Sequence, residues 1–470
     1  MKIKPLIISA ILMRSVSLGQ VPKIAWAKAI GGPGNERANT VVADIHGNLI
    51  VAGRFQSKEI TLDQVSLTKN PADPNEAADI FILKLDNKGK ALWGLAAGDY
   101  GDDHALSCAT DSRGFIYAAG YFECETLKFG SVSVRNSNFV AGKDSVKYNC
   151  DLWLAKFSPD GKCIWMKSAG GEGANGQYGS IAIDEQNNVI VSGIAGSILD
   201  FGNGVKLTSE KGGAYVAKYT NDGQLLWAKG SEKTQFQGLA TDNESNIYAG
   251  GFFEGKVTFG QTELNPNGKT DACIVKYSPD GNILWAKNFG GEDGEIASCA
   301  TDASGHVYLS GLYFSKTIIT GKDTLKNKGV INHFIAKFDR AGNYLWAKSA
   351  GGNNGDRPAT ATREFFIDKD GSAYCTGSNW SEFGFAGKTI KTVSGSEDIL
   401  LLKYDKDGKE VWGADYGGSG RNAGRGIAGD NYGNIYLTGS FDEKLLKLDD
   451  YTLSNKGDSD ILLVKYSSQK

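Results

Sequence analysis

The chain repeats itself seven times, and this repetition constrains the fold more than any other feature of the sequence. A tryptophan, mostly in the phrase LWAK, recurs at Trp26, Trp93, Trp165, Trp227, Trp285, Trp346 and Trp412. A glycine recurs at Gly53, Gly120, Gly193, Gly251, Gly311, Gly377 and Gly439. A lysine recurs at Lys84, Lys156, Lys218, Lys276, Lys337, Lys403 and Lys465. Three columns that agree on seven copies indicate a repeat protein of seven equivalent units.

Each copy contains four short runs rich in Val, Ile, Tyr, Phe and Trp, which predict four strands. We name them A, B, C and D, as in IASCATD (ending at Asp302), HVYLSG, HFIAKF and YLWAKS. An Asp-x-x-Gly turn joins A to B, and turns such as Ser-Pro-Asp-Gly from Ser158 join C to D. Because proline, aspartate and glycine suit tight turns, the four strands of a copy form consecutive hairpins.

Seven such units predict an all-β seven-bladed β-propeller, in which each blade is a four-stranded antiparallel sheet that packs on its neighbours. The Trp column and the recurring Tyr of strand B then form the core between blades. The first D strand, Ile24 to Lys28, precedes every complete copy, and the last copy ends with a C strand that starts at Asp460. We therefore expect the N-terminal strand to complete the last blade and close the ring.

An aspartate column at the end of strand A accompanies the lysine column at the end of strand C. Its members are Asp44, Asp111, Asp184, Asp242, Asp302, Asp368 and Asp430. Seven repeated ion pairs are expected, and a site repeated in every blade is structural rather than catalytic.

The phrases GNIYLTGSF from Gly433 and SPDGNILWAK from Ser278 resemble the bacterial seven-bladed β-propeller repeat, abbreviated SBBP. The resemblance covers about residues 24 to 467. It implies a propeller in an extracytoplasmic bacterial setting, and it implies no particular reaction.

The chain begins with basic residues, an apolar run from Pro5 to Met13 and small residues before Gln20. This pattern predicts a secretory signal peptide over residues 1–19, followed by a single propeller domain over residues 20–470. An ordinary disordered terminus is the alternative, and the run is too short to span a membrane. The net charge of −3 argues against a nucleic-acid partner or a polybasic membrane patch.

Seven cysteines are an odd number for an oxidising compartment, and none forms a Cys-x-x-Cys motif. Cys108 and Cys299 occupy a core column. Cys124 and Cys150 flank one long loop, and the sequence leaves open whether they form a disulfide.

Functional residues are expected on the upper face, where the B–C and D–A loops differ from copy to copy, whereas the A–B and C–D turns of the lower face are uniform. The B–C segments predict small hairpins over the blades, which either bind a ligand or cover apolar edges. Charged residues near the starts of the A strands converge on the mouth of the ring. The candidates are Arg37, Asp103, His104, Glu295, Arg363, Glu364 and Arg425. One histidine beside acids is poor support for a metal site, so no metal or other cofactor is expected.

Two functions fit these observations. The first is a secreted, non-catalytic scaffold that binds a protein or glycan of the cell envelope, within or beside an outer-membrane-associated complex. The second is a polysaccharide-acting enzyme, a glycosidase or lyase. It needs paired carboxylates, or a base with an arginine, at fixed separations. Glu295 or Glu364 with Asp103, and His104 with Arg363, are its candidate pairs. The absence of a nucleophile motif favours the first function.

Overall fold

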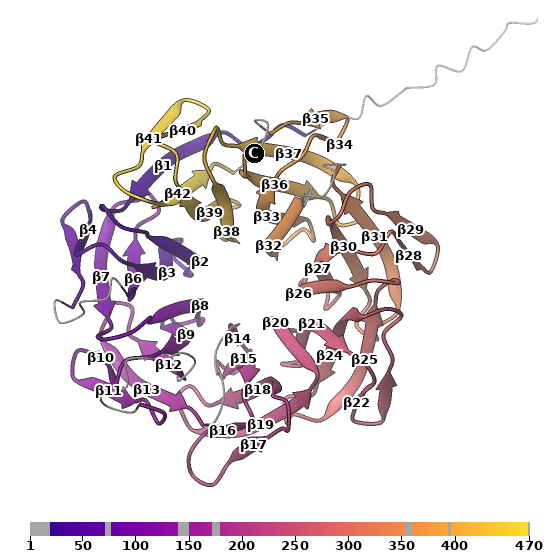
Figure 1. Ribbon diagram of the computed structural model, residues 1–470, viewed down its shortest axis with the longest axis horizontal. Coiled ribbons are helices and arrows are strands. Elements are labelled where there is room, and N and C mark those ends of the chain that lie inside the picture. The colour runs from indigo at the N-terminus through magenta and orange to yellow at the C-terminus, as the bar shows by residue number, and fades with distance from the viewer. Residues whose placement is uncertain are drawn as a thin grey trace, which may run out of the picture.

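Seven four-stranded antiparallel sheets surround a central axis in the computed structural model, as Figure 1 shows. The structure describes residues 19–70, 77–139, 150–171, 179–352, 360–392 and 396–468, with the side chains of residues 360–363 outside this description. The predicted signal peptide and the longest parts of the first two B–C segments lie outside these residues. The seven-bladed propeller predicted from the repeats is confirmed.

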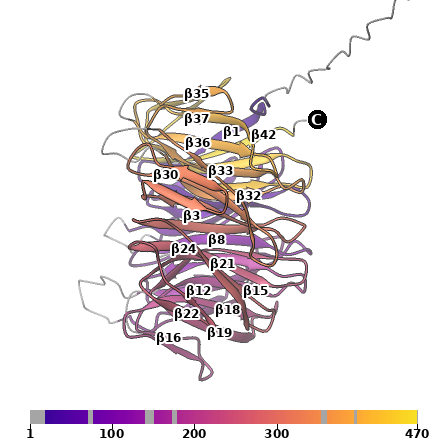
Figure 2. The ribbon, with the colours of Figure 1, turned by 90° about the vertical axis from the view of Figure 1, so that its right-hand side faces the viewer.

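Each blade presents its A strand to the axis and its D strand to the outside (Figures 1 and 2). The A strands are β2 (Arg37–Ala43), β8 (His104–Thr110), β14 (Ser180–Ile183), β20 (Thr234–Thr241), β26 (Glu295–Thr301), β32 (Thr360–Ile367) and β38 (Asn422–Gly429). The B strands are β3 (Leu49–Phe55), β9 (Ile116–Phe122), β15 (Val189–Ala195), β21 (Ile247–Glu254), β27 (Val307–Tyr313), β33 (Ala373–Asn379) and β39 (Ile435–Phe441). The C strands are β6 (Asp79–Leu85), β12 (Asp151–Phe157), β18 (Gly213–Tyr219), β24 (Thr270–Tyr277), β30 (Asn332–Phe338), β36 (Asp398–Tyr404) and β42 (Asp460–Tyr466). The D strands are β7 (Ala91–Ala97), β13 (Cys163–Ala169), β19 (Leu225–Glu232), β25 (Ile283–Phe289), β31 (Tyr344–Ala350), β37 (Glu410–Tyr416) and, for blade 7, β1 (Ile24–Ile30).

The ring closes as the sequence predicts. Strand β1 pairs with β42, with Ala27 opposite Val464 and Ile30 opposite Ile461. Ile24 and Ile30 are 2% and 0% exposed, so both ends of the strand are anchored in the core. Blade 7 therefore joins the two ends of the chain.

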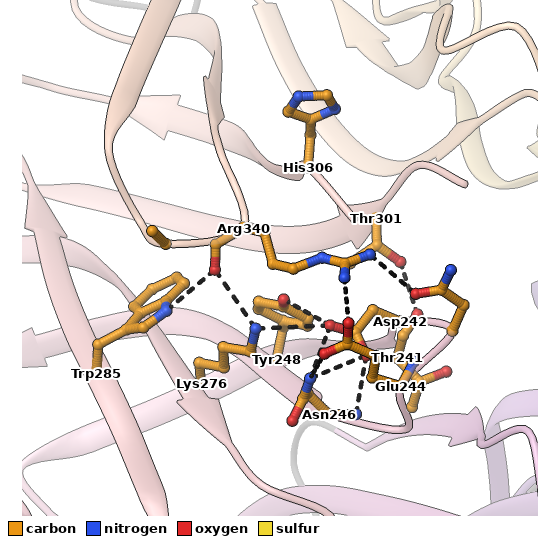
Figure 3. Close-up of polar contacts among 12 residues, drawn as sticks. Thr241, Asp242, Glu244, Asn246, Tyr248, Lys276, Trp285, Thr301, His306 and Arg340 are labelled. Carbon is orange, nitrogen blue, oxygen red and sulfur yellow. Dashed lines mark hydrogen bonds and ion pairs between the residues drawn. The ribbon is translucent and has the colours of Figure 1, made fainter. Parts of the chain in front are cut away.

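A repeated polar motif fastens each blade to the next on the lower face, and Figure 3 shows it between blades 4 and 5. Nε1 of Trp285 and Nζ of Lys276 both donate to the main-chain oxygen of Arg340, in the C–D turn of the following blade, at 3.3 and 3.4 Å. The Lys276 ammonium lies over the ring of Tyr248, which donates to Asp242 at 2.9 Å. The aromatic columns are thus confirmed as core between blades.

The expected lysine–aspartate ion pairs are present in four blades. They are Lys84–Asp44 (2.9 Å), Lys218–Asp184 (2.8 Å), Lys276–Asp242 (3.6 Å) and Lys337–Asp302 (3.2 Å). In blade 2 the Arg113 guanidinium pairs with Asp111 at 2.9 Å instead. The prediction of seven ion pairs was therefore right in kind and too high in number for the described residues.

The B–C segments form seven two-stranded hairpins, which lie around the outside of the ring in Figure 1. They are β4 (Glu59–Leu62) with β5 (Val65–Thr68), β10 (Thr126–Phe129) with β11 (Val132–Arg135), β16 (Ile198–Asp200) with β17 (Lys206–Thr208), β22 (Val257–Phe259) with β23 (Thr262–Leu264), β28 (Thr317–Thr320) with β29 (Asp323–Lys326), β34 (Phe383–Phe385) with β35 (Lys388–Ile390), and β40 (Leu445–Leu448) with β41 (Tyr451–Ser454).

The hairpin tips reach the start of the D strand, where Oδ2 of Asp63 accepts the N–H of Ala91 at 2.8 Å. Apolar hairpin side chains such as Leu62 and Leu67 are buried against the blade. The hairpins therefore cover the outer edges of the blades and do not overhang the mouth.

All seven cysteines are buried, and Cys124 is a thiol that is not joined to Cys150. Within the described residues, no helix is long and apolar enough to cross a membrane.

Candidate functional site

A channel of about 530 Å³ runs along the propeller axis and is lined by the seven A strands. Most of the residues that line it are small or β-branched (Gly, Ala, Ser, Thr, Val or Ile), because the strands converge there and leave little room. The residues at one level of the wall are Thr40, Ser107, Ser180, Gly238, Ser298, Glu364 and Gly426.

The hydroxyls of the wall bind neighbouring blades together. Oγ of Ser107 accepts the N–H of Ile181 at 3.2 Å, and Oγ of Ser180 accepts the N–H of Leu239 at 3.1 Å. Nearer the lower face, at the end of β20, the Thr241 hydroxyl donates to the Ile183 carbonyl at 2.8 Å. These groups stabilise the ring and leave the channel wall mostly uncharged.

Glu364 is the one charged residue among the described residues that line the channel. Its side chain is exposed to the channel, and partial loss of hydration within the ring of strands raises the pKa of Glu364 above its ordinary value. Glu364 is therefore a lone acid placed to meet a donor or a cation that enters the channel.

Two predicted arginines occupy β-bulges just above this level. The register of the A and B strands shifts between Thr362 and Glu364 in blade 6, and between Gly424 and Gly426 in blade 7. The extra residue of each bulge is an arginine, Arg363 or Arg425, and a bulge re-aims the side chain of its strand. Nε of Arg425 donates to the Ser440 hydroxyl at 3.4 Å, whereas the side chain of Arg363 lies outside the described part.

Two of the predicted acids, Asp103 and Glu295, are fully buried and do not face the mouth. Oδ1 of Asp103 accepts the N–H of Glu123 at 2.9 Å, and a carboxylate oxygen of Glu295 accepts the N–H of Gly291 at 3.1 Å. Burial raises the pKa of Asp103 to about 8 and that of Glu295 to about 7. Both acids fix the D–A loop to the start of the B–C segment, as does Glu36 in blade 1.

His104 and Arg37 occupy the same position in blades 2 and 1. The His104 ring is buried, stacks on Tyr121 with centroids 4.6 Å apart and places Nδ1 3.1 Å from the Tyr121 hydroxyl. Burial, together with the charges of Arg54 and Arg37, lowers the pKa of His104 to about 3, so the ring is neutral. Arg37 is half-buried and lies opposite Arg54 on the adjacent strand.

Of the seven candidates, only Glu364 lines the channel. The bulge residues Arg363 and Arg425 directly precede the lining residues Glu364 and Gly426 in sequence, and Arg37 is half-buried opposite Arg54. Asp103, Glu295 and His104 are buried away from the channel. Within the described chain, no group of three or more His, Cys, Asp or Glu side chains is arranged to hold a metal ion.

A buried carboxyl pair lies on the upper side of blade 6. Asp415 accepts the side-chain N–H of Asn379 at 2.8 Å and lies beside Asp398. Burial, together with the Asp398 charge, raises the pKa of Asp415 to about 8. In blade 4 the equivalent of Asp415 is Asn288, whose amide donates to Asp271 at 2.7 Å. Protonated Asp415 can therefore donate a hydrogen bond to Asp398, as the Asn288 amide donates to Asp271.

We expect Asp415→Asn to stabilise the protein at pH 8 by about 1 to 3 kcal/mol, because the amide donates without a proton. Because the pKa of Asp415 is raised in the folded protein, its stabilising effect is complete below the ordinary pKa of 3.8, which holds for the unfolded chain. The effect is lost as the pH rises toward 8. The two proteins should thus be equally stable near pH 4 and diverge above it in urea unfolding. Asp407→Asn, an exposed change in the same blade, is the control. If the free energies of unfolding of the two proteins differed by the same amount at every pH, Asp415 would not be protonated in the folded protein.

The junction of blades 6 and 7 contains a pocket that the sequence comparison did not single out. The position of Phe366 holds Val42 or alanine in every other blade, and the position of Gly429 holds Ala, Thr or Ile. A Cβ at Gly429 would lie 2.5 Å from the Phe366 ring, so the two exceptions are complementary. Both exceptions are visible in the sequence when the seven repeats are aligned.

Together, the seven sheets, the closing strand and the narrow hydroxyl-lined channel define a seven-bladed β-propeller with one lone channel acid. No protein-family model matches the chain. It is similar to an uncharacterized WD repeat-containing protein, L264, of Acanthamoeba polyphaga mimivirus, with 25% identity over 398 residues, covering 68% of this chain and 28% of the viral protein. The chain thus spans less than a third of that relative's length.

Several solved structures share the fold at low sequence identity. The Dos1 propeller is 8% identical, with a TM-score of 0.43 and coverage of 94% of this chain and 96% of that one. A polysaccharide lyase of family PL25, an ulvan lyase, is 9% identical, with a TM-score of 0.46 and the same coverage. The C-terminal WD40 domain of Sif2 is 7% identical, with a TM-score of 0.40 and coverage of 93% and 99%. Likenesses at this level concern the fold alone.

Proposed function

We propose that the protein is a secreted, non-catalytic binding propeller that holds a protein or glycan of the cell envelope at the upper mouth of its channel. The observation that carries this proposal is the channel wall, in which Glu364 is the single charged lining residue within the described part. A ligand that places a basic or hydroxyl group in the channel would meet this carboxyl, with Arg425 on the same side of the ring. Secretion rests on the N-terminal sequence pattern, and the envelope setting rests on the SBBP-like phrases.

The alternative function, a polysaccharide-acting enzyme, is not supported by the positions of its candidate residues. Glycoside cleavage needs two carboxyls that both reach the substrate. Asp103 and Glu295 are each 0% exposed and hydrogen-bonded to loop N–H groups, and the His104 ring is buried and neutral. The likeness to a polysaccharide lyase concerns the overall fold and brings no catalytic residues to this chain. A binding scaffold therefore fits the site better than an enzyme does.

The test is capture of a ligand from native envelope extract and on a glycan array, with the protein from Gln20 onward as bait. We expect Glu364→Gln to weaken the captured ligand about tenfold, since one charge-assisted hydrogen bond is lost. Glu263→Gln, in an exposed ion pair of an outer hairpin, should leave binding unchanged.

Two outcomes would overturn the proposal. One is a ligand that binds Glu364→Gln and the wild type equally. The other is a product formed from a polysaccharide panel and lost in Glu364→Gln, which would establish the enzyme instead.

A further inference from the structure

The junction of blades 6 and 7 lacks a contact that the other blades make on the lower face. In six junctions the lysine of one blade donates to a C–D turn carbonyl of the next, and the acceptors are Asn87, Pro159, Asn221, Pro279, Arg340 and Lys406. In five of these, the tryptophan donates to the same carbonyl. Blade 7 has no C–D turn, because its D strand is β1 from the other end of the chain.

The donors at this junction are left without an acceptor. Trp412 is 1% exposed, and its Nε1 has no hydrogen-bond partner within the described residues. Lys403, half-buried over the ring of Tyr374, makes no ion pair or hydrogen bond with another described residue. Ser468 stands at the sequence position of the missing acceptor, but its N–H donates to the Asn434 side chain at 3.2 Å. A buried donor without an acceptor is costly, which singles this junction out.

A pocket of about 180 Å³ lies between the A–B turns of blades 6 and 7 at the same junction. Its lining includes Asp368, Asp370 and Asp430, and also Phe366 and Tyr374, whose stacked rings have centroids 4.8 Å apart. Carboxylates beside aromatic rings suit a planar cation.

Between blades 4 and 5 the corresponding space is filled by an arginine from the chain itself, as Figure 3 shows. The Arg340 guanidinium contacts Glu244, donates to Asn243 at 2.9 Å and donates to the Ser304 carbonyl at 3.4 Å. A Cβ at Gly305 would lie 2.4 Å from Nε of Arg340, so the guanidinium packs directly on that turn.

The same turn positions at the 6–7 junction hold Asp370 in place of Glu244 and Gly433 in place of Gly305. At Gly433 only Ser468 comes within 4 Å of an added Cβ. The Asp370 carboxylate is exposed and pairs with Lys369 at 3.0 Å, an exposed pair that a ligand can exchange at little cost.

We propose that this pocket binds the guanidinium of an arginine side chain presented by a protein partner. The guanidinium takes the place that Arg340 fills two blades away, and it pairs with Asp370 against the Phe366–Tyr374 stack. Gly19 lies beside Trp412 on the N-terminal side, so the proposal rests on the pocket and on the space that Arg340 fills between blades 4 and 5.

This site lies on the face opposite the channel mouth, and its test does not depend on the proposed function. The probes are N-acetyl-arginine amide, methylguanidine and N-acetyl-citrulline amide, the last having the shape of arginine without its charge. Binding to the full chain is measured by saturation-transfer NMR. We expect the first two probes to bind in the millimolar range and Asp370→Asn to weaken them about tenfold, with citrulline not binding.

Glu244→Gln is the matched control, because Arg340 already fills that space, and it should not change binding. Arg340→Ala should open a second site that Glu244→Gln then removes. Equal binding of the citrulline and arginine probes would overturn the proposal. So would equal effects of Asp370→Asn and Glu244→Gln on the arginine probe.

Discussion

A chain that starts at Gly31 is expected to lose cooperative unfolding, because blade 7 then lacks its D strand. Strand β1 contributes a full ladder with β42 and buries Ile24 and Ile30 in the cores of blades 7 and 1. Removing two buried isoleucines costs about 2 to 5 kcal/mol each, a large share of an ordinary domain's stability. We expect a loss of at least about 5 kcal/mol in guanidinium unfolding.

The control is a chain that starts at Gly19, which keeps β1 and should unfold like the full chain. A synthetic peptide of residues 19–30, added to the shortened protein, should restore stability, with a gain that grows as the logarithm of the peptide concentration above its Kd. If the chain from Gly31 unfolds at the same denaturant concentration as the control, the closing strand does not stabilise the ring.

Asp184→Asn is expected to destabilise the protein by about 3 to 5 kcal/mol, because it leaves the buried Lys218 ammonium without its counter-ion. The two side chains are 3% and 0% exposed and lie 2.8 Å apart. Thermal and urea unfolding measure the effect. The double change Asp184→Asn with Lys218→Met should recover part of the loss, since no charge then remains buried.

Glu263→Gln is the comparison for this second result. It breaks an ion pair with Lys256 whose side chains are 61% and 49% exposed, and such pairs contribute at most about 1 kcal/mol. Similar losses in Asp184→Asn and Glu263→Gln would show that the repeated motif is not what holds the blades together.

The sequence predicted the blades, the closing strand and the polar motif because these features recur, and each column reports one position seven times. The destinations of single side chains did not recur and were harder to predict. Asp103 and Glu295 lie where their A strands begin at the upper face, yet loop N–H groups bind their carboxylates, from Asp99 and Glu123 for Asp103 and from Gly291 for Glu295.

Two further features that the sequence did not predict arise from backbone geometry and hairpin packing. The β-bulges at Arg363 and Arg425 depend on a shift of register that alternation alone does not show. The B–C hairpins fold down the outside of the blades because their apolar side chains bury against the D strands. By contrast, Phe366 could have been found as the one aromatic residue in a column of alanine and valine, and Gly429 as the one glycine in a column of Ala, Thr and Ile.

The pairing of β1 with β42 also sets an order for folding. During synthesis the first strand leaves the ribosome long before its partner, and the Tyr451 hydroxyl that donates to the Ala25 carbonyl lies 426 residues further along the chain. Contacts within each blade are local and form early, whereas the closing contact is about as distant in sequence as this chain permits. The growing protein is therefore an open arc with a detached strand at one end. We expect ring closure to be the late and slow step of folding, and the step at which another copy's strand could be captured instead.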